Sequence, residues 1–326
     1  MTDIRKDPFS GSVVIYSPDR ENRPDFTGIK RSIELSPENC PFCEGNEDMT
    51  PPEIFRIADS GSSWKIRVIP NKFPVLNVEE KYNRTDEGVL EKFAGAGAHE
   101  IIIETPSHFE DITLHDTDYF RNIFITYRDR IRDLKKDFRL QYIQIFKNHK
   151  ASAGATISHH HSQLIALPFV PEEVEKKLAF LKVFYKENNR SLFSEIISIE
   201  LGHKKRIVSE NEGFIAVAPW YSRTPFQVSL YQKAGYPRFE DIKNEDLENL
   251  SEIFSKVMKK LISALGDIPF NFVLYNLPFT EKDDAGFNWY IEILPAIGGT
   301  GGFEAATGTY INTVLPEKAA EILNKF

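Results

Sequence analysis

Three consecutive histidines, His159, His160 and His161, directly precede an apolar segment that ends at Pro168. The apolar run predicts a buried strand, in which successive side chains alternate between the two faces. If the strand begins at the histidines, His159, His161 and Gln163 share one face and His160 points to the other. Two imidazoles and a carboxamide can bind a metal, attack phosphorus or hold phosphoryl oxygens. Surface histidines at the entrance of a strand are the alternative interpretation.

The two cysteines of the chain, Cys40 and Cys43, are separated by two residues in a turn context. With no other cysteine present, a secreted disulfide framework is excluded. Thiols at this spacing favour a zinc site, which needs further ligands from elsewhere in the chain. A redox pair is an alternative, although the strand-then-helix pattern of thioredoxin-like proteins is missing here. Two unrelated free thiols are the third possibility.

Length and composition limit the protein class. A chain of 326 residues predicts about two domains, and 41% apolar with 27% charged residues is ordinary for a globular protein. The net charge of −8, without a basic face, argues against a nucleic-acid partner. Residues 1–6 lack the apolar core of a secretory signal, and no run reaches membrane-spanning length. We therefore expect a cytoplasmic protein without a membrane partner.

The chain also repeats itself. Residues 109–112 (FEDI) recur as residues 239–242, and each copy leads into a helix with apolar residues at helical spacing. Each helix is followed by two strand-like runs, the second of which ends in proline: residues 140–146 and 163–168 in the first copy, residues 270–275 and 290–295 in the second. Strand-like runs also precede both helices, at residues 101–103 and 226–230. The order predicts an α+β fold with two units, each an antiparallel sheet with a packed long helix.

Alignment of the two units on their shared proline places His161 opposite Asn288 and His159 opposite Gly286. No histidine follows His203. The chemistry is therefore predicted for the first unit, residues 1–170. The second unit, residues 171–326, is expected to supply binding surface or structural support.

Residues 154–163 resemble the active-site motif of the galactose-1-phosphate uridylyltransferase family, the transferase branch of the histidine-triad superfamily. The similarity spans almost the whole chain and includes residues 5–8, 17–20, 67–71, 146–148 and 302–304 as well as the cysteine pair. In residues 151–154, 164–168 and 301–304 the chain is especially similar to the ADP-glucose phosphorylase branch. The resemblance implies two tandem histidine-triad-like units.

The resemblance also implies a double displacement through a nucleotidyl-histidine intermediate, with His161 as the nucleophile. Imidazole suits this step because it is nucleophilic in its neutral form near neutral pH. Gln163 stands where related hydrolases have a third histidine. A carboxamide orients phosphoryl oxygens but does not readily pass protons to water, so we expect transfer to outrun hydrolysis.

For the cysteine pair the resemblance implies one structural zinc ion per chain, with four ligands: Cys40, Cys43, His108 and His159. The alternative for His108 is a plain loop histidine, in which case His99 or His115 would replace it. Many bacterial uridylyltransferases bind a second metal through a histidine-rich strand. Residues 287–293 contain no histidine, so we expect no second site.

By position, the resemblance assigns substrate contacts to ten residues: Arg20, Arg23, Asn71, Phe146, Asn148, Gly154, Thr156, Gly301, Phe303 and Glu304. Surface arginines at 20 and 23, core packing of Phe146 and a flexible glycine-rich turn at residues 298–302 are the alternatives. The related site is built across two subunits, which implies a homodimer. The sugar-proximal glutamine of the family has no clear counterpart near Tyr310, which leaves the acceptor open.

The favoured function is therefore transfer of UMP between UDP-glucose and a hexose 1-phosphate, as in galactose metabolism, with a nucleotide sugar and a sugar 1-phosphate as partners. The nearest alternative is an ADP-glucose phosphorylase, which transfers the adenylyl group to phosphate. A dinucleoside polyphosphate hydrolase is disfavoured by Gln163. A zinc-stabilised nucleotide-binding module without activity would leave His161 and Gln163 without a purpose.

Overall fold

A computed structural model describes residues 2–6, 13–16, 35–61, 63–108, 116–282, 286–299 and 301–326. The predicted substrate residues Arg20 and Arg23 lie outside these ranges, as do His115 and the first FEDI copy at 109–112. None of the described helices combines the length and apolar composition needed to cross a membrane.

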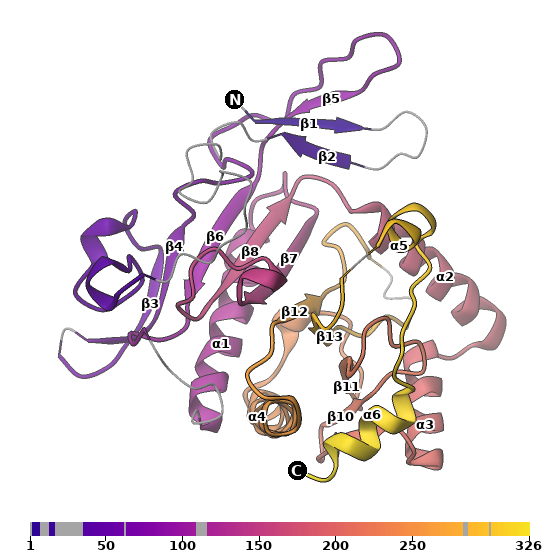
Figure 1. Ribbon diagram of the computed structural model, residues 1–326. Coiled ribbons are helices and arrows are strands. Elements are labelled where there is room, and N and C mark those ends of the chain that lie inside the picture. Colours follow the sequence, from indigo (N-terminus) through magenta and orange to yellow (C-terminus); the bar gives the residue numbers. More distant parts are fainter. Residues whose placement is uncertain are drawn as a thin grey trace.

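The central element is a ten-stranded sheet in which every neighbouring pair is antiparallel. Figure 1 shows its first half in indigo and magenta and its second half in salmon and orange. In spatial order the strands are β3 (Phe55–Ala58), β4 (Trp64–Pro70), β6 (Ala98–Ile103), β8 (His161–Leu167), β7 (Tyr142–His149), β12 (Phe270–Tyr275), β13 (Tyr290–Pro295), β11 (Val228–Gln232), β10 (Phe214–Val217) and β9 (Ile207–Glu210).

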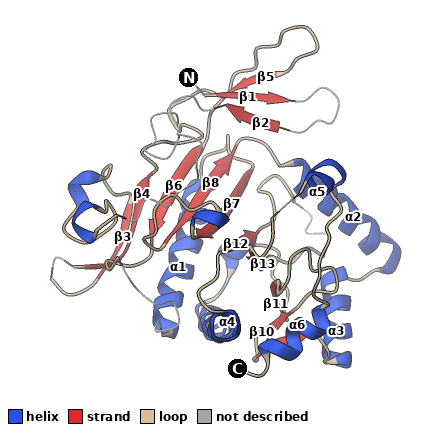
Figure 2. Cartoon of the chain, in the orientation of Figure 1, coloured by secondary structure: helices blue, strands red, loops and turns tan. Residues whose placement is uncertain are grey.

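A small separate sheet and six helices complete the described structure (Figure 2). The small sheet has the order β2 (Val13–Tyr16), β1 (Asp3–Lys6) and β5 (Lys92–Ala94). The helices are α1 (Thr117–Leu134), α2 (Glu172–Asn188), α3 (Leu192–His203), α4 (Asn244–Leu265), α5 (Gly302–Thr307) and α6 (Pro316–Leu323). Short 3-10 turns lie at Pro37–Asn39, Glu47–Met49, Ala151–Ala153 and Phe239–Asp241.

The predicted α+β duplication is confirmed. The strand order β4-β6-β8-β7 on one side of the centre is mirrored by β10-β11-β13-β12 on the other, and α1 corresponds to α4. The sequence predicts one sheet per unit, and the structure adds that β7 and β12 pair, so the two sheets are continuous.

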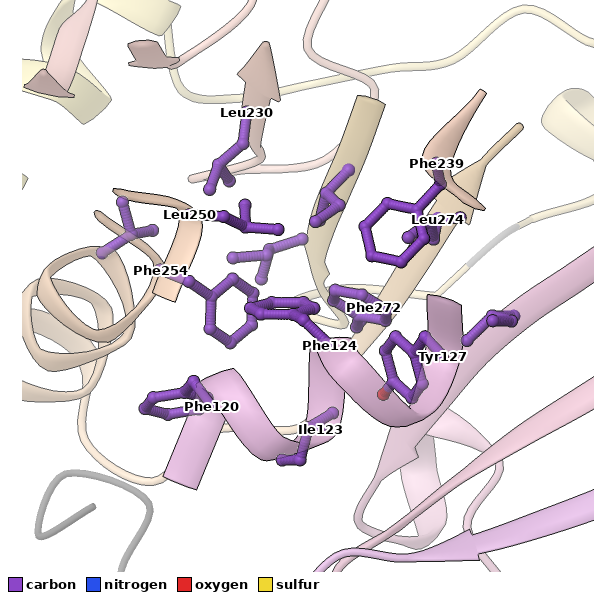
Figure 3. Close-up of a cluster of buried hydrophobic side chains, with 14 of the residues drawn as sticks. Phe120, Ile123, Phe124, Tyr127, Leu230, Phe239, Leu250, Phe254, Phe272 and Leu274 are labelled. Carbon is purple, nitrogen blue, oxygen red and sulfur yellow. The ribbon is translucent and has the colours of Figure 1, made fainter. Parts of the chain in front are cut away.

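Helices α1 and α4 pack together on one face of the sheet and form the largest core (Figure 3). Helix α1 begins after Asp116, whose carboxylate caps it by accepting a hydrogen bond from Tyr119 N (2.9 Å). Phe124 of α1 meets Phe254 of α4 edge to face, with ring centroids 5.3 Å apart. Each buried phenylalanine contributes about 1.5–3 kcal/mol, and such a ring pair adds about 0.5–1.5 kcal/mol.

The opposite face of the sheet is covered differently in the two halves. Over the second half, Leu178 of α2 and Phe193 of α3 pack against Tyr231 and Tyr290 of the sheet. Over the first half, the segment that carries Cys40 and Cys43 packs against β4 and β6. Loops and short 3-10 turns, including Asn39 and Met49, surround a cavity beside β8 on this half.

Candidate active site and metal cluster

Strand β8 places its side chains on two faces, as the sequence predicts. His161 and Gln163 line a cavity on the open face of the sheet. Ser162 points the other way, toward Tyr127 of α1, and His160 points toward Lys147. His159 precedes the strand and turns to the cysteines, so it does not line the cavity with the other two.

The cavity has a volume of about 660 Å³, which is sufficient for a nucleotide-sized ligand. Its walls are largely apolar and include Leu35, Met49, Phe73 and Ile157. The fold brings seven predicted residues to it: Asn71, Phe146, Asn148, Gly154, Thr156, His161 and Gln163.

The imidazole of His161 is oriented by a hydrogen bond to the backbone just before β8. Its Nδ1 lies 2.7 Å from the backbone oxygen of His159 and donates a proton to it. The neutral ring therefore carries its lone pair on Nε2. The edge of the Phe42 ring packs on the same imidazole, with centroids 5.2 Å apart. The geometry fixes both the orientation and the tautomer of the predicted nucleophile.

The loop from Asn148 to Thr156 forms one wall of the cavity. Asn148 Nδ2 donates to Gly154 O (3.3 Å), and Gly154 adopts φ +97°, which favours glycine. A Cβ at this position would lie 3.1 Å from the Asn148 amide nitrogen. From the second half of the sheet, Asn271 Nδ2 donates to Asn148 Oδ1 (2.7 Å) and Ala153 O (2.8 Å). The second unit thus holds this wall.

The four predicted metal ligands lie together and are all buried, with their donor atoms within 4.8 Å of one another. The Sγ atoms lie 3.3–3.6 Å from the histidine Nδ1 atoms. Tetrahedral zinc bonds separate sulfur and nitrogen ligands by about 3.6 Å, so the cluster fits this ion. His159 Nε2 donates to Thr105 O (2.7 Å), which leaves Nδ1 as the ligand atom.

His159 is in the protonation state that a metal ligand needs. Burial lowers the pKa of His159 to about 4, so the ring is neutral at physiological pH. Burial and the neighbouring Cys40 thiol raise the pKa of Cys43 to about 12. A divalent cation reverses such a shift because it stabilises the thiolates. Among the described residues, this is the only group of three or more His, Cys, Asp and Glu side chains whose donor atoms lie close enough together to hold a metal ion.

The predicted residues of the C-terminal segment do not reach the cavity of the same chain. Gly301, Phe303 and Glu304 belong to the start of α5, and Phe303 is 51% exposed. Glu304 Oε2 accepts a hydrogen bond from Gly301 N (3.0 Å). Glu292, on strand β13, is not part of this C-terminal segment; its side chain accepts a hydrogen bond from Arg223.

Behind β8, on the α1 side, lies a buried polar network that the sequence analysis did not predict. The Glu104 carboxylate accepts hydrogen bonds from the Lys147 ammonium and the Ser162 hydroxyl. The Lys147 ammonium also donates to His160 Nδ1 (3.1 Å). These contacts join β6, β7 and β8 at the end where His161 stands.

His99 is another residue with a place in the site that the sequence analysis missed. The sequence suggests His99 only as a replacement metal ligand. The structure places it in the cavity wall, buried, with Nε2 3.1 Å from Gln163 Oε1. The period-two pattern of residues 98–103 puts His99 and Ile101 on one face, but only strand pairing shows that this face meets Gln163.

Comparison with known proteins agrees with these features. A family profile described as "Domain of unknown function (DUF4921)" matches residues 67–325. ADP-glucose phosphorylase of Arabidopsis thaliana is 35% identical over 332 residues, covering 99% of this chain and 92% of that protein. Galactose-1-phosphate uridylyltransferase of Thermotoga maritima is 25% identical over 334 residues, covering 100% of this chain and 98% of that protein.

Solved structures show the same fold. A structure of the A. thaliana ADP-glucose phosphorylase with bound ADP-glucose matches with a TM-score of 0.80 and 32% identity, covering 100% of this chain and 99% of that chain. A uridylyltransferase structure matches with a TM-score of 0.82 at 24% identity, covering 99% and 97%, and supports the fold alone. The chain therefore belongs to the DUF4921 family and, within the nucleotidyltransferases, to the galactose-1-phosphate uridylyltransferase family, with higher identity to A. thaliana ADP-glucose phosphorylase than to T. maritima uridylyltransferase.

Proposed function

We propose that this protein transfers the adenylyl group of ADP-glucose to phosphate through a covalent intermediate on His161. The observation that carries the chemistry is the His161 imidazole, which donates from Nδ1 to a backbone carbonyl and thereby keeps the Nε2 lone pair in a nucleotide-sized cavity. The adenylyl donor is supported by 35% identity to ADP-glucose phosphorylase against 25% to a uridylyltransferase. This preference reverses the order expected from the sequence, which placed UMP transfer first.

In the first step, His161 Nε2 attacks the α-phosphorus, and the bond from this phosphorus to the bridging oxygen breaks. Glucose 1-phosphate leaves as a stable anion, so no strong general acid is needed. The imidazole becomes cationic in the adduct, and the carbonyl of His159 stabilises the proton on Nδ1. In the second step, a phosphate oxygen attacks the same phosphorus, the P–N bond breaks, and ADP is released.

We assign the Cys40, Cys43, His108 and His159 cluster to one structural zinc ion. All four positions of a tetrahedron are filled by protein donors, so the ion would fix the fold without contacting substrate. Phe42, which stands between the two cysteines, would carry this rigidity to the His161 ring.

We further propose a homodimer in which Gly301, Phe303 and Glu304 serve the cavity of the second copy. Gly301 and Phe303 are exposed, and none of the three residues lines the cavity of its own chain, which supports this arrangement. Mixing His161→Asn subunits with Glu304→Ala subunits should regain activity that neither variant has alone. Activity that stays absent in the mixture would reject the shared site.

With this function we propose different roles for the two units, residues 1–170 and residues 171–326. The first unit supplies the nucleophile and the metal ligands. The second unit supplies Asn271 and the C-terminal substrate residues, and Asn288, just before its last strand, stands where the first unit has His161.

The deciding experiment incubates the enzyme with ADP-glucose or UDP-glucose labelled at the α-phosphorus, followed by denaturation. We expect an acid-labile adenylyl adduct that is absent in His161→Asn. A uridylyl adduct alone would establish UMP transfer instead. No adduct with either donor, or labelling of the His161→Asn variant, would reject the proposed mechanism.

A further inference from the structure

The side chain of His99, on β6, lies between a backbone donor and the amide of Gln163. Val75 N donates a hydrogen bond to His99 Nδ1 (3.2 Å). A backbone N–H can only donate, so Nδ1 must carry a lone pair. The neutral ring of His99 therefore bears its proton on Nε2.

His99 Nε2 lies 3.1 Å from both Gln163 Oε1 and Asn71 Nδ2. Asn71 Oδ1 already accepts a hydrogen bond from Phe73 N (2.9 Å), so its other amide atom is the NH₂ group, which is a donor. With the proton on Nε2, the Asn71 NH₂ group cannot form a hydrogen bond with this nitrogen, and the proton is accepted by Gln163 Oε1. This contact decides which way the Gln163 carboxamide faces.

We infer that His99 is a positioning residue for the reaction: it holds Gln163 Oε1 and thereby turns the Gln163 NH₂ group toward the phosphoryl oxygens. The inference rests on the proposed function, because it needs a phosphoryl group in the cavity beside His161. With the amide reversed, its carbonyl oxygen would face the negatively charged phosphoryl oxygens and repel them.

The position of His99 in the sheet supports this role. Its Cα is paired with that of Ile165, and the next residue on the same face, Ile101, is paired with Gln163. His99 is 5% exposed, so its hydrogen bonds have little competition from water. The His99 ring is therefore held by the sheet as well as by Val75.

Two substitutions separate the roles of the two ring nitrogens. His99→Asn can keep an acceptor for Val75 N near the Nδ1 position but loses the donor to Gln163. His99→Gln can keep a donor near the Nε2 position. We expect His99→Asn to slow adduct formation at saturating ADP-glucose by about 10- to 100-fold, the range for a hydrogen bond to a charged group, while His99→Gln retains most of the rate. Melting temperatures of both variants report any general loss of structure.

The decisive test is a double-mutant cycle with His99→Asn and Gln163→Ala, measured as the single-turnover rate of adduct formation. If His99 acts through Gln163, adding His99→Asn to Gln163→Ala changes the rate little. If the rate losses of the two single variants multiply in the double variant, the inference is overturned while the proposed function remains intact. A wild-type enzyme that forms no adduct with either nucleotide sugar would reject both the inference and the proposed function.

A measurement on the wild-type protein guards against variants that do not fold. ¹⁵N NMR distinguishes the two neutral tautomers of histidine. We expect the Nε2–H tautomer for His99, assigned by comparison with the His99→Gln spectrum or by sequential connectivity. The Nδ1–H tautomer would overturn the inference.

Discussion

Asn271, on β12, donates a hydrogen bond to the amide oxygen of Asn148, its cross-strand partner on β7 (2.7 Å). The two residues stand on the two strands that join the halves of the sheet. Through this contact and the bond to Ala153 O, the half without catalytic histidines supports the loop that lines the cavity. The pairing of β7 with β12 therefore makes both halves part of one site.

Replacing Asn271 by alanine should weaken substrate binding. Two hydrogen bonds of about 0.5–1.5 kcal/mol each are lost, so we expect KM for the nucleotide sugar to rise about 10-fold, with a smaller change in kcat. Steady-state kinetics measures both values. Asn276→Ala is the matched control: this buried residue bonds Phe239 N and Glu240, so its loss should lower the melting temperature and leave KM unchanged. If Asn271→Ala and Asn276→Ala changed KM equally, the role of Asn271 in substrate binding would be contradicted.

Removing the metal should cost both stability and activity. Chelation, or the Cys40→Ser substitution, is expected to release zinc, lower the melting temperature by several degrees and slow adduct formation, because Phe42 between the ligands packs on His161. Elemental analysis, calorimetry and single-turnover kinetics measure the three effects. His203→Asn, at an exposed histidine, should retain zinc. The assignment of a structural zinc ion would be refuted by wild-type protein that is purified without stoichiometric metal and is as stable without the metal as with it.

Gln163→His should convert part of the transfer activity into hydrolysis. An imidazole can accept the proton of an attacking water, which a carboxamide does poorly. In the absence of phosphate we therefore expect free AMP to be released from the adduct faster than in the wild type. The rate should increase as the pH rises through about 6.5, since the neutral ring is the base. Gln163→Ala is the control and should show no such increase. An unchanged rate of AMP release in Gln163→His would argue against this explanation of the preference for transfer.

Lys147→Met should destabilise the protein by about 3–5 kcal/mol, because it leaves the buried Glu104 carboxylate without its cation. Both side chains of this pair are less than a tenth exposed. Denaturant unfolding measures the free energy. Lys136→Met is the matched control, because Lys136 pairs with Asp133 at the surface with its side chain 77% exposed; it should change the free energy by less than about 1 kcal/mol. A similarly small effect for Lys147→Met would show that Glu104 is not a buried charge that depends on this partner.

Much of the fold follows from the order of short patterns along the chain. The helix and the strands of each unit appear in the same sequence, and the apolar spacing of residues such as Phe124 and Phe254 shows which face of each helix is buried. The alternation of side chains along β8 places His161 and Gln163 together without reference to any other strand. Likewise, the spacing of Cys40 and Cys43 is sufficient to suggest a metal knuckle.

The tertiary structure decided what depends on partners far apart in the chain. His99 and Gln163 are 64 residues apart, and Asn148 and Asn271 are 123 apart. A hydrophobic pattern states which face of a strand is buried, but not which strand lies beside it or in which register. Strand pairing and packing decide three features: the direction of the Gln163 amide, the contact of the second half with the cavity wall, and the position of α5 away from the cavity of the same chain. Their physical basis is the geometry of hydrogen bonds, which local sequence does not contain.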